Sequence, residues 1–283
     1  MPKSKKKMTA AEKAAARVPD IPDPAKEAEW AAKVERMKPT KKERRGRFAL
    51  LIGGLLVLLV LSFTLYTCNY SHETDVAREA LVPTEQVAVD NQSGWIAFGD
   101  PSAEKGFVLY PGGKVAPEAY APLMHELADR GVFCVIAKMP FNLAFFGTDA
   151  ADGVIAAYPQ VKTWYVGGHS LGGPVACRWV VKDPNRVAGV VLLATYTTVD
   201  LTNTGVRVLE VYGSNDTAMN RDNYVESQPL LPTDTTEVII QGGNHAQFGE
   251  YGEQNGDGAP AISAEEQRKQ AADALVDWMN AAS

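Results

Sequence analysis

Cysteine and histidine are scarce in this chain. Its 283 residues include three cysteines and four histidines, too few for a disulfide framework and without the spacing of a zinc site. Cys134 and Cys177 lie in apolar runs that are typical of a core strand and a packed helix, which predicts buried, unreactive thiols. We therefore expect no metal and no other cofactor.

Basic residues are also few after the first 47 positions. The chain carries 28 Lys and Arg against 34 Asp and Glu, a net charge of −6. Residues 1–47 hold 15 of the basic and 7 of the acidic residues, which leaves 13 basic and 27 acidic residues for the remainder. This acidic remainder argues against nucleic acid as a partner. The two parts are expected to face different compartments.

One long apolar run interrupts the chain at residues 48–67. Its sequence, FALLIGGLLVLLVLSFTLYT, contains no charged side chain. As a helix it would be about 30 Å long, the thickness of the hydrocarbon core of a bilayer. A core helix rarely runs so far without a polar interruption. The run predicts a single transmembrane helix that attaches the protein to the membrane.

The residues before this run predict its orientation. Basic side chains near a span tend to stay in the cytoplasm. The N-terminus is therefore expected in the cytoplasm, and the chain after the span is expected on the outer side of the cell membrane. The basic residues next to the span are Lys41, Lys42, Arg44, Arg45 and Arg47.

Residues 1–47 are expected to form a disordered basic tail, because Pro19, Pro22 and Pro24 interrupt any helix. The basic cluster 41–47 could bind anionic lipid or act only as a topology signal, and for residues 3–7 we favour the second. A cleaved signal peptide would need a shorter basic region and a small-x-small site. A lipoprotein anchored at Cys68 would need a small residue in place of Tyr66.

The chain after the span is expected to be a polar stalk, residues 68–84, and one folded domain, residues 85–283. Residues 86–90 and 95–98 flank Asn-Gln-Ser-Gly, which predicts an antiparallel hairpin. Apolar strand-like runs then alternate with helical segments, which predicts a largely parallel sheet covered by helices on both faces. The expected strands are 107–110, 132–137, 164–168, 187–194, 206–212 and 237–240, and the expected helices are 117–130, 148–157, 172–182, 221–228 and 264–280.

The pentapeptide Gly-His-Ser-Leu-Gly at 168–172 has the Gly-x-Ser-x-Gly pattern, with an expected strand before it and a helix after it. A chain that reverses this sharply needs glycine on both sides of Ser170, because side chains at these two positions would collide. The following helix points its free N–H groups at the turn. These features predict Ser170 as a nucleophile and the N–H of Leu171 as an oxyanion donor.

On these residues the chain resembles the alpha/beta-hydrolase superfamily over nearly all of residues 86–281. The run Gly-Asn-His-Ala-Gln-Phe-Gly at 243–249 resembles that of small, bacterial, membrane-anchored members. The resemblance implies an alpha/beta-hydrolase fold with an acid at Asp216 and a base at His245, each after a strand, in the family's order Ser, Asp, His. Asp222 is the nearest substitute for the acid.

Elimination supports the choice of His245. The other three histidines lie in the expected stalk, in a helix and inside the turn, so only His245 follows the end of a strand; these three are His72, His125 and His169.

The loop after the expected strand 107–110 reads Pro-Gly-Gly-Lys, where many relatives have His-Gly. Its glycines let a backbone N–H turn inward, so Gly113 or Lys114 is the expected second oxyanion donor. Such a donor is worth about 3 kcal/mol in the transition state.

The connection 195–205, only 11 residues, is too short for the lid that many relatives insert there. An open, shallow site is expected, which suits short acyl esters or a group that protrudes from a larger molecule. Phe248 and Tyr251, in the long segment after His245, are candidates for a wall of the acyl pocket or for simple anchors of a surface loop.

These features favour a serine hydrolase that cleaves carboxylic esters through an acyl-enzyme intermediate. The substrate would be a small-molecule, lipid or polymer ester. An acyltransferase or lipase acting on envelope lipid or wall polymer is the second hypothesis, and a non-catalytic binding protein on a hydrolase scaffold is the third.

Overall fold

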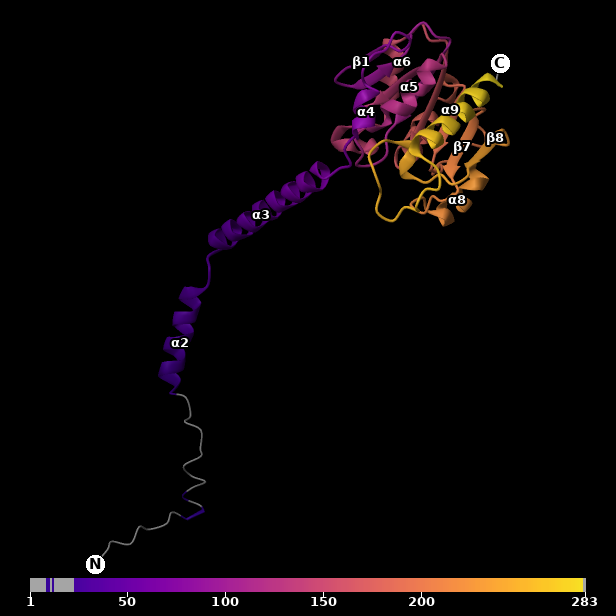
Figure 1. The fold of residues 1–283 in the computed structure, drawn as a ribbon. Coiled ribbons are helices and arrows are strands. Elements are labelled where there is room, and N and C mark those ends of the chain that lie inside the picture. The colour runs from indigo at the N-terminus through magenta and orange to yellow at the C-terminus, as the bar shows by residue number, and fades with distance from the viewer. Residues whose placement is uncertain (1–8, 11, 13–22, 282–283) are drawn as a thin grey trace, which may run out of the picture. The chain divides into compact units, whose positions relative to one another are not determined.

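A computed structural model describes residues 9, 10, 12 and 23–281 of the chain. By its contacts the chain divides into two units, residues 1–62 and residues 63–283. The first unit holds helix α2, Pro24–Met37, and most of helix α3, Lys41–Cys68 (Figure 1). Residues 24–37 of the tail that was expected to be disordered are thus helical, while the basic cluster 3–7 lies outside the described residues.

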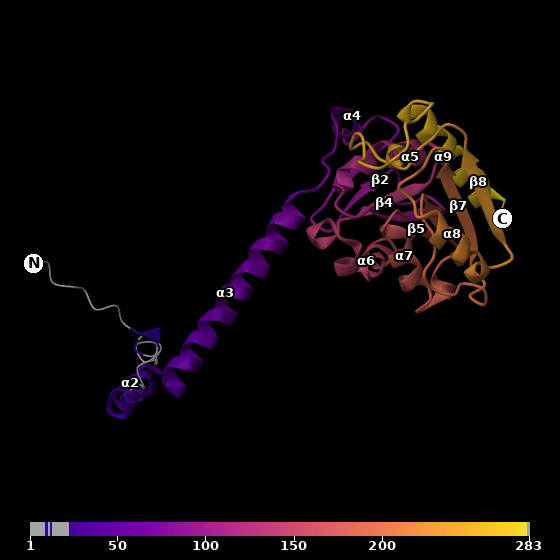
Figure 2. The same cartoon turned by 90° about the horizontal axis from the view of Figure 1, so that it is seen from below.

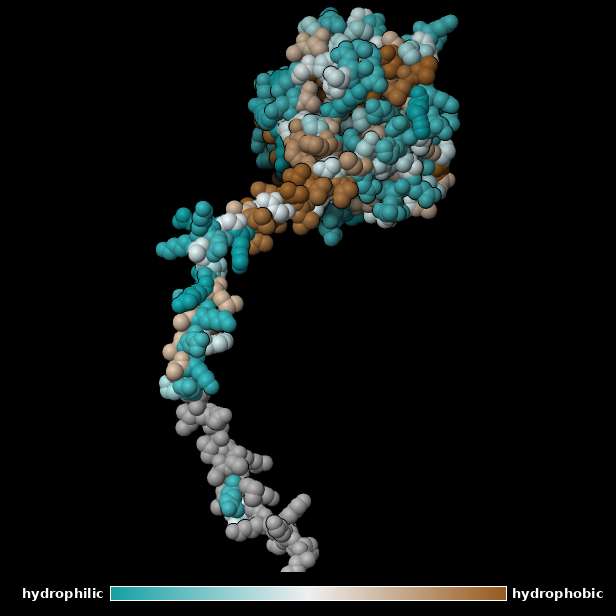
Figure 3. Space-filling view, turned by 90° about the vertical axis from the view of Figure 1, so that its left-hand side faces the viewer, coloured by the Kyte–Doolittle hydropathy of each residue, from teal (hydrophilic) through white to brown (hydrophobic). Residues whose placement is uncertain are grey.

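The start of helix α2 is explained by its first two residues, the cap Asp23 and Pro24. Pro24 occupies a first-turn position, where its missing N–H costs nothing, and the Asp23 carboxylate accepts a hydrogen bond from the N–H of Ala25 at 3.0 Å. Pro24, which would break the interior of a helix, therefore starts one here. Every residue of α2 is exposed, and its surface is mostly hydrophilic (Figure 3).

The helix α3 contains the expected span 48–67 and begins seven residues earlier. Thr40 and Glu43 form a reciprocal capping box, with the N–H of each bonded to the side chain of the other at 2.7 and 3.2 Å. This cap explains the earlier start. The helix is long and apolar enough to cross a membrane, and its apolar side chains are exposed along its length (Figure 3).

One mixed sheet forms the centre of the second unit, with strand order β1-β2-β4-β3-β5-β6-β7-β8. The first two strands form the expected antiparallel hairpin, and β3 to β8 run parallel to one another. The predicted fold class is confirmed. The strands are β1 Val89–Asn91, β2 Trp95–Phe98, β3 Lys105–Tyr110, β4 Phe133–Ala137, β5 Thr163–His169, β6 Gly189–Leu193, β7 Arg207–Gly213 and β8 Thr235–Ile240.

Helices cover both faces of this sheet. One face packs against α5, Ala121–Asp129, and α9, Ala264–Asn280; the other packs against α6, Ala150–Ala157, and α7, Gly172–Val180 (Figure 2). Successive strand residues join opposite cores: Leu109 packs on the α5 side and Val108 on the α7 side. This burial on both faces explains why the central strands are continuous apolar runs.

The remaining helices are short. They are α4 Asp75–Glu79, α8 Arg221–Ser227 and the 3-10 turns η1 Pro117–Tyr120, η2 Pro140–Asn142, η3 Ala144–Gly147, η4 Pro184–Arg186, η5 Gln228–Leu230 and η6 Ala246–Phe248.

The connection from β6 to β7 contains no helix and no strand over residues 194–206. The expectation that no lid domain is inserted there is confirmed for this part of the chain.

The segment expected to be a stalk, residues 68–84, packs on the folded domain. Ser71 pairs with Val115 as a parallel bridge, and Thr74 donates its N–H to the carbonyl of Glu250 at 2.8 Å. In α4 the side chain of Ala77 is fully buried. The segment is polar in composition, but its backbone groups and one small apolar side chain bind it to the domain. Such contacts leave no sequence pattern, so the segment was predicted to be a stalk.

Candidate active site

The turn between β5 and α7 has the geometry that its glycines were expected to allow. Ser170 adopts a left-handed backbone with φ of 50°, a strained conformation for a residue with a side chain. A Cβ on Gly168 would lie 2.3 Å from the backbone of Gly172, and one on Gly172 would lie 2.0 Å from the carbonyl oxygen of Tyr110. Only glycine fits at either position. Ser170 is therefore held at the carboxyl edge of the sheet.

Two of the expected site residues are hydrogen-bonded to each other. Nδ1 of His245, after β8, lies 2.9 Å from Oδ2 of Asp216, after β7, and both side chains are buried. The other Asp216 oxygen accepts the N–H groups of Ala218 and Met219 at 3.0 and 2.8 Å. The carboxylate is thus fixed and aimed at the imidazole. Asp222, the substitute acid, is exposed on α8.

The backbone that carries His245 is held on both sides. The Gln267 side chain accepts the N–H of Asn244 and donates to its carbonyl, both at 2.8 Å. The Asp257 carboxylate accepts the N–H of Ala246 at 2.9 Å. Neither support was predicted, because both residues are distant in sequence and carry no recognisable motif.

Ser170 and His245 share no hydrogen bond between their side chains in the described part of the chain. The imidazole of His245 lies beside the turn, since its ring centre is 4.6 Å from that of His169. Catalytic hydrogen bonds are often long in the absence of substrate and shorten when it binds.

The backbone N–H groups near Ser170 distinguish the two candidate donors. The N–H of Lys114 is bonded to the carbonyl of Asn142 at 2.7 Å. The N–H groups of Gly113 and Leu171 meet no acceptor among the described residues. A Cβ on Gly113 would lie 2.6 Å from the Leu171 side chain, so the two loops are in contact. Gly113, rather than Lys114, has the free donor.

A buried chain of hydrogen bonds connects these loops. The N–H of Gly112 donates to the Tyr120 hydroxyl at 2.9 Å, the hydroxyl donates to Nδ1 of His169 at 2.8 Å, and Nε2 of His169 donates to the carbonyl of His245 at 3.1 Å. Burial holds the pKa of His169 well below its usual value, which keeps the ring neutral with one donor and one acceptor nitrogen. Sequence elimination discarded His169, and Tyr120 carried no signal.

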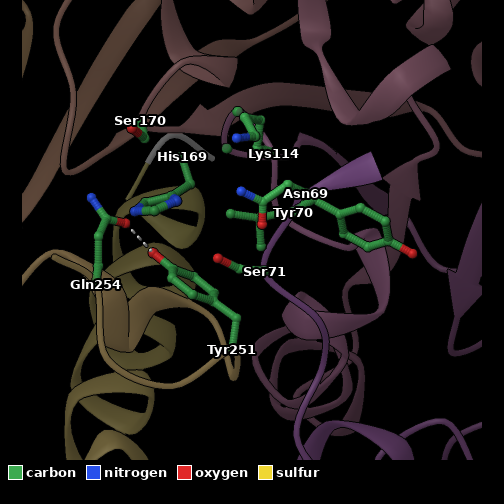
Figure 4. Close-up of a pocket in the computed structure, with 11 residues that line it drawn as sticks. Asn69, Tyr70, Ser71, Lys114, His169, Ser170, Tyr251 and Gln254 are labelled. Atoms are coloured by element: carbon green, nitrogen blue, oxygen red, sulfur yellow. Dashed lines mark hydrogen bonds between the residues drawn. The ribbon is translucent and has the colours of Figure 1, made fainter. Parts of the chain in front are cut away.

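A pocket of about 340 Å³ opens over Ser170 (Figure 4). Of the two residues expected in its wall, Tyr251 lines the pocket and donates its hydroxyl to Oε1 of Gln254 at 3.1 Å. Phe248 does not line the pocket. It is fully buried, and its ring centre lies 5.8 Å from that of His169. Part of the unpredicted lining comes from the chain leaving α3, namely Asn69, Tyr70 and Ser71.

Within residues 23–281 no three His, Cys, Asp or Glu side chains gather as metal ligands. Burial raises the pKa values of the Cys134 and Cys177 thiols, the second to about 12, which agrees with the expectation of unreactive cysteines.

Comparison with known proteins relates the chain to one family. The family model described as "Alpha/beta hydrolase family" matches residues 106–269, more than half of the chain. No curated protein sequence gives a significant match.

Solved structures share the fold at low sequence identity. A predicted CIB-like hydrolase from Thermoplasma acidophilum is 15% identical with a TM-score of 0.50, covering 68% of this chain and 98% of that one. A putative lipase from Acinetobacter baumannii is 12% identical with a TM-score of 0.54, covering 78% and 96%. A membrane phospholipase A, described as a bacterial virulence factor, is 10% identical with a TM-score of 0.53, covering 85% and 99%. At these identities the likeness concerns the fold alone.

Proposed function

We propose that this chain, which belongs to the alpha/beta hydrolase family, is a serine hydrolase that cleaves carboxylic esters with Ser170, His245 and Asp216. The buried hydrogen bond between Asp216 and His245, beside the strained Ser170, is the observation that carries this proposal. A carboxylate bonded to Nδ1 leaves Nε2 of the imidazole free to accept a proton. The free N–H groups of Leu171 and Gly113 supply donors for an oxyanion.

The reaction proceeds in two steps in this proposal. His245 accepts the Ser170 proton while Oγ attacks the ester carbonyl, and it returns that proton to the leaving alcohol as the C–O bond breaks. Water then attacks the acyl-enzyme with His245 again as base, which releases the acid. Asp216 holds the imidazole in one tautomer and stabilises its charged form. The small open pocket suits a short acyl group or one that protrudes from a larger molecule.

The location of this chemistry follows from α3. We infer that residues 48–67 cross the cell membrane once, with the N-terminus in the cytoplasm and the catalytic domain outside. The exposed apolar side chains of α3 support the span, and the basic residues at its start support its orientation.

A fluorophosphonate probe tests the nucleophile. In detergent-solubilised full-length protein, we expect one phosphonyl group per chain, located on Ser170 by mass spectrometry, and none in Ser170→Ala. Ser102→Ala, which changes an exposed serine, is the matched control and should label normally. Labelling that persists in Ser170→Ala would refute the assignment, and an unlabelled parent would favour the binding-protein hypothesis.

A product assay separates hydrolysis from acyl transfer. When a short p-nitrophenyl ester is supplied with an added alcohol, a hydrolase releases the free acid, whereas an acyltransferase forms the ester of the added alcohol.

The Tyr120 hydroxyl provides a second test, since it positions the loops without contacting substrate. In Tyr120→Phe the bond from Gly112 and the bond to His169 are lost, at a cost of about 1–2 kcal/mol. We expect kcat for a short ester to fall about tenfold with KM nearly unchanged. Tyr165→Phe, which removes a buried hydroxyl bonded to the carbonyl of Met279, should leave kcat unaltered. An equal fall in both variants would contradict the positioning role.

A further inference from the structure

Four of the nine phenylalanines are exposed and lie together in the second unit. The rings of Phe63, Phe141 and Phe146 form a triangle of edge-to-face contacts with centre distances of 5.2, 5.4 and 6.1 Å. Phe145 is next to Phe146 in the turn η3, and its side chain is 56% exposed. We call Phe63, Phe141, Phe145 and Phe146 the aromatic patch. Exposed apolar side chains that gather in this way mark an interaction surface.

The backbone of this patch is held in a disfavoured conformation. Phe141 and Asn142 have φ values of 59° and 54°, the left-handed region that a bulky side chain rarely adopts. Phe141, in this conformation, is 53% exposed. Burial of the Phe141 side chain in the core would stabilise the domain, so its exposed position is unfavourable for folding. A strained residue in such a position is typical of a functional surface.

Asn142, the residue after Phe141, connects this part of the chain to the pocket over Ser170. The carbonyl of Asn142 accepts the N–H of Lys114 at 2.7 Å, and Lys114 lines the pocket. The Lys114 ammonium lies 4.3 Å from the ring centre of Tyr66, in the last turn of α3. Three residues further on, the chain from Asn69 to Ser71 forms part of the pocket wall (Figure 4). Patch, pocket and the end of α3 are therefore adjacent within this unit.

We propose that the aromatic patch inserts into the boundary between lipid headgroups and acyl chains, and that the pocket over Ser170 takes its ester from an amphiphile in that membrane. Phe63 belongs both to the patch and to the apolar run 48–67, which makes the patch continuous with the inferred span. Tyr66 and Lys114 are the residue types that favour the headgroup level. The choice of substrate rests on the proposed function, whereas the membrane contact does not.

Tryptophan quenching tests the membrane contact. Phe145→Trp and Phe146→Trp in the full-length protein are reconstituted into phosphatidylcholine bilayers with and without brominated acyl chains. We expect the added fluorescence, relative to the parent, to be quenched at least twofold by the brominated lipid. Ile239→Trp is the control, because Ile239 is exposed on β8. In the sheet, β8 lies five strands from β4, the strand that leads to Phe141, Phe145 and Phe146. Unquenched tryptophan at both 145 and 146 would overturn the membrane contact and favour a protein partner for the patch.

A pair of substrates tests the origin of the ester. In the double variant Phe145→Ser, Phe146→Ser we expect kcat/KM for a long-chain phospholipid ester in vesicles to fall tenfold or more. The value for water-soluble p-nitrophenyl acetate should not change, and neither value should change in Ile239→Ser. Equal losses on both substrates, or no loss on either, would overturn the membrane origin of the substrate. A parent inactive on both would refute the proposed function, while the quenching experiment would still decide the membrane contact.

Discussion

Replacing Asp216 by asparagine is expected to lower kcat/KM for a short ester about 10⁴-fold, or about 5.5 kcal/mol. The carboxylate holds the proton on Nδ1 of His245, and this pair is almost completely buried, so solvent does not readily take the place of the carboxylate. An asparagine amide that donated to Nδ1 would move the proton to Nε2, which could then no longer accept one from Ser170. Steady-state kinetics on the full-length protein measure the loss.

Asp222→Asn is the matched control for this experiment. Asp222 is the alternative acid by sequence, six positions further along, but it is exposed on α8. The variant should keep the activity of the parent. A loss of less than tenfold in Asp216→Asn, or a comparable loss in Asp222→Asn, would contradict the assigned roles. Thermal unfolding of each variant in detergent separates a catalytic effect from a folding defect.

The sheet was predictable because its strands are buried on both faces. Most central strands are then continuous apolar runs, which sequence patterns identify directly, and β7 departs from this only at Glu210. The helix α9 was expected at its observed bounds, Ala264–Asn280. The first strand was less clear. It was expected at 86–90 and is observed at Val89–Asn91, because β1 is an exposed edge strand with a weak pattern.

The candidate site was predictable where local backbone geometry restricts residue choice, at Ser170, and where the resemblance places a residue after a strand, at Asp216 and His245. The glycines around Ser170 are required by close backbone contacts that the pentapeptide already implies. Tyr120, Gln267 and the pocket residues 69–71 had no such signal, since they reach the site from distant parts of the chain through tertiary contacts. The segment 69–71 in particular looks like a linker until its hydrogen bonds to the domain are known.

Glu210 is a buried acid that the proposed mechanism does not use. It lies on β7, opposite Glu237 on β8, and its side chain is 1% exposed. Tyr224 bonds to both carboxylates, at 3.3 Å to Glu210 and 2.5 Å to Glu237, and Oε1 of Glu210 has no partner among the described residues. Burial, together with the Glu237 charge, raises the pKa of Glu210 to about 7.

This raised pKa makes the stability of the domain depend on pH. Between the ordinary pKa of 4.5 and about 7 the folded state binds a proton that the unfolded state releases, so stability falls as pH rises through this window. The difference amounts to about 3 kcal/mol at pH 8. We expect Glu210→Gln, which cannot ionise, to gain stability over the parent as the pH rises. Its free energy of unfolding relative to the parent should be about 2.5 kcal/mol higher at pH 8 than at pH 5, because the unfolded parent is already mostly ionised at pH 5.

Urea unfolding of the full-length protein in detergent measures this difference. Glu226→Gln, which neutralises an exposed acid on α8, is the control and should differ from the parent equally at both pH values. A Glu210→Gln protein whose advantage over the parent is the same at pH 5 and pH 8 would show that Glu210 does not titrate in this range. A growing advantage would mean that β7, the strand that leads into the loop of Asp216, carries an acid that destabilises the domain once it ionises.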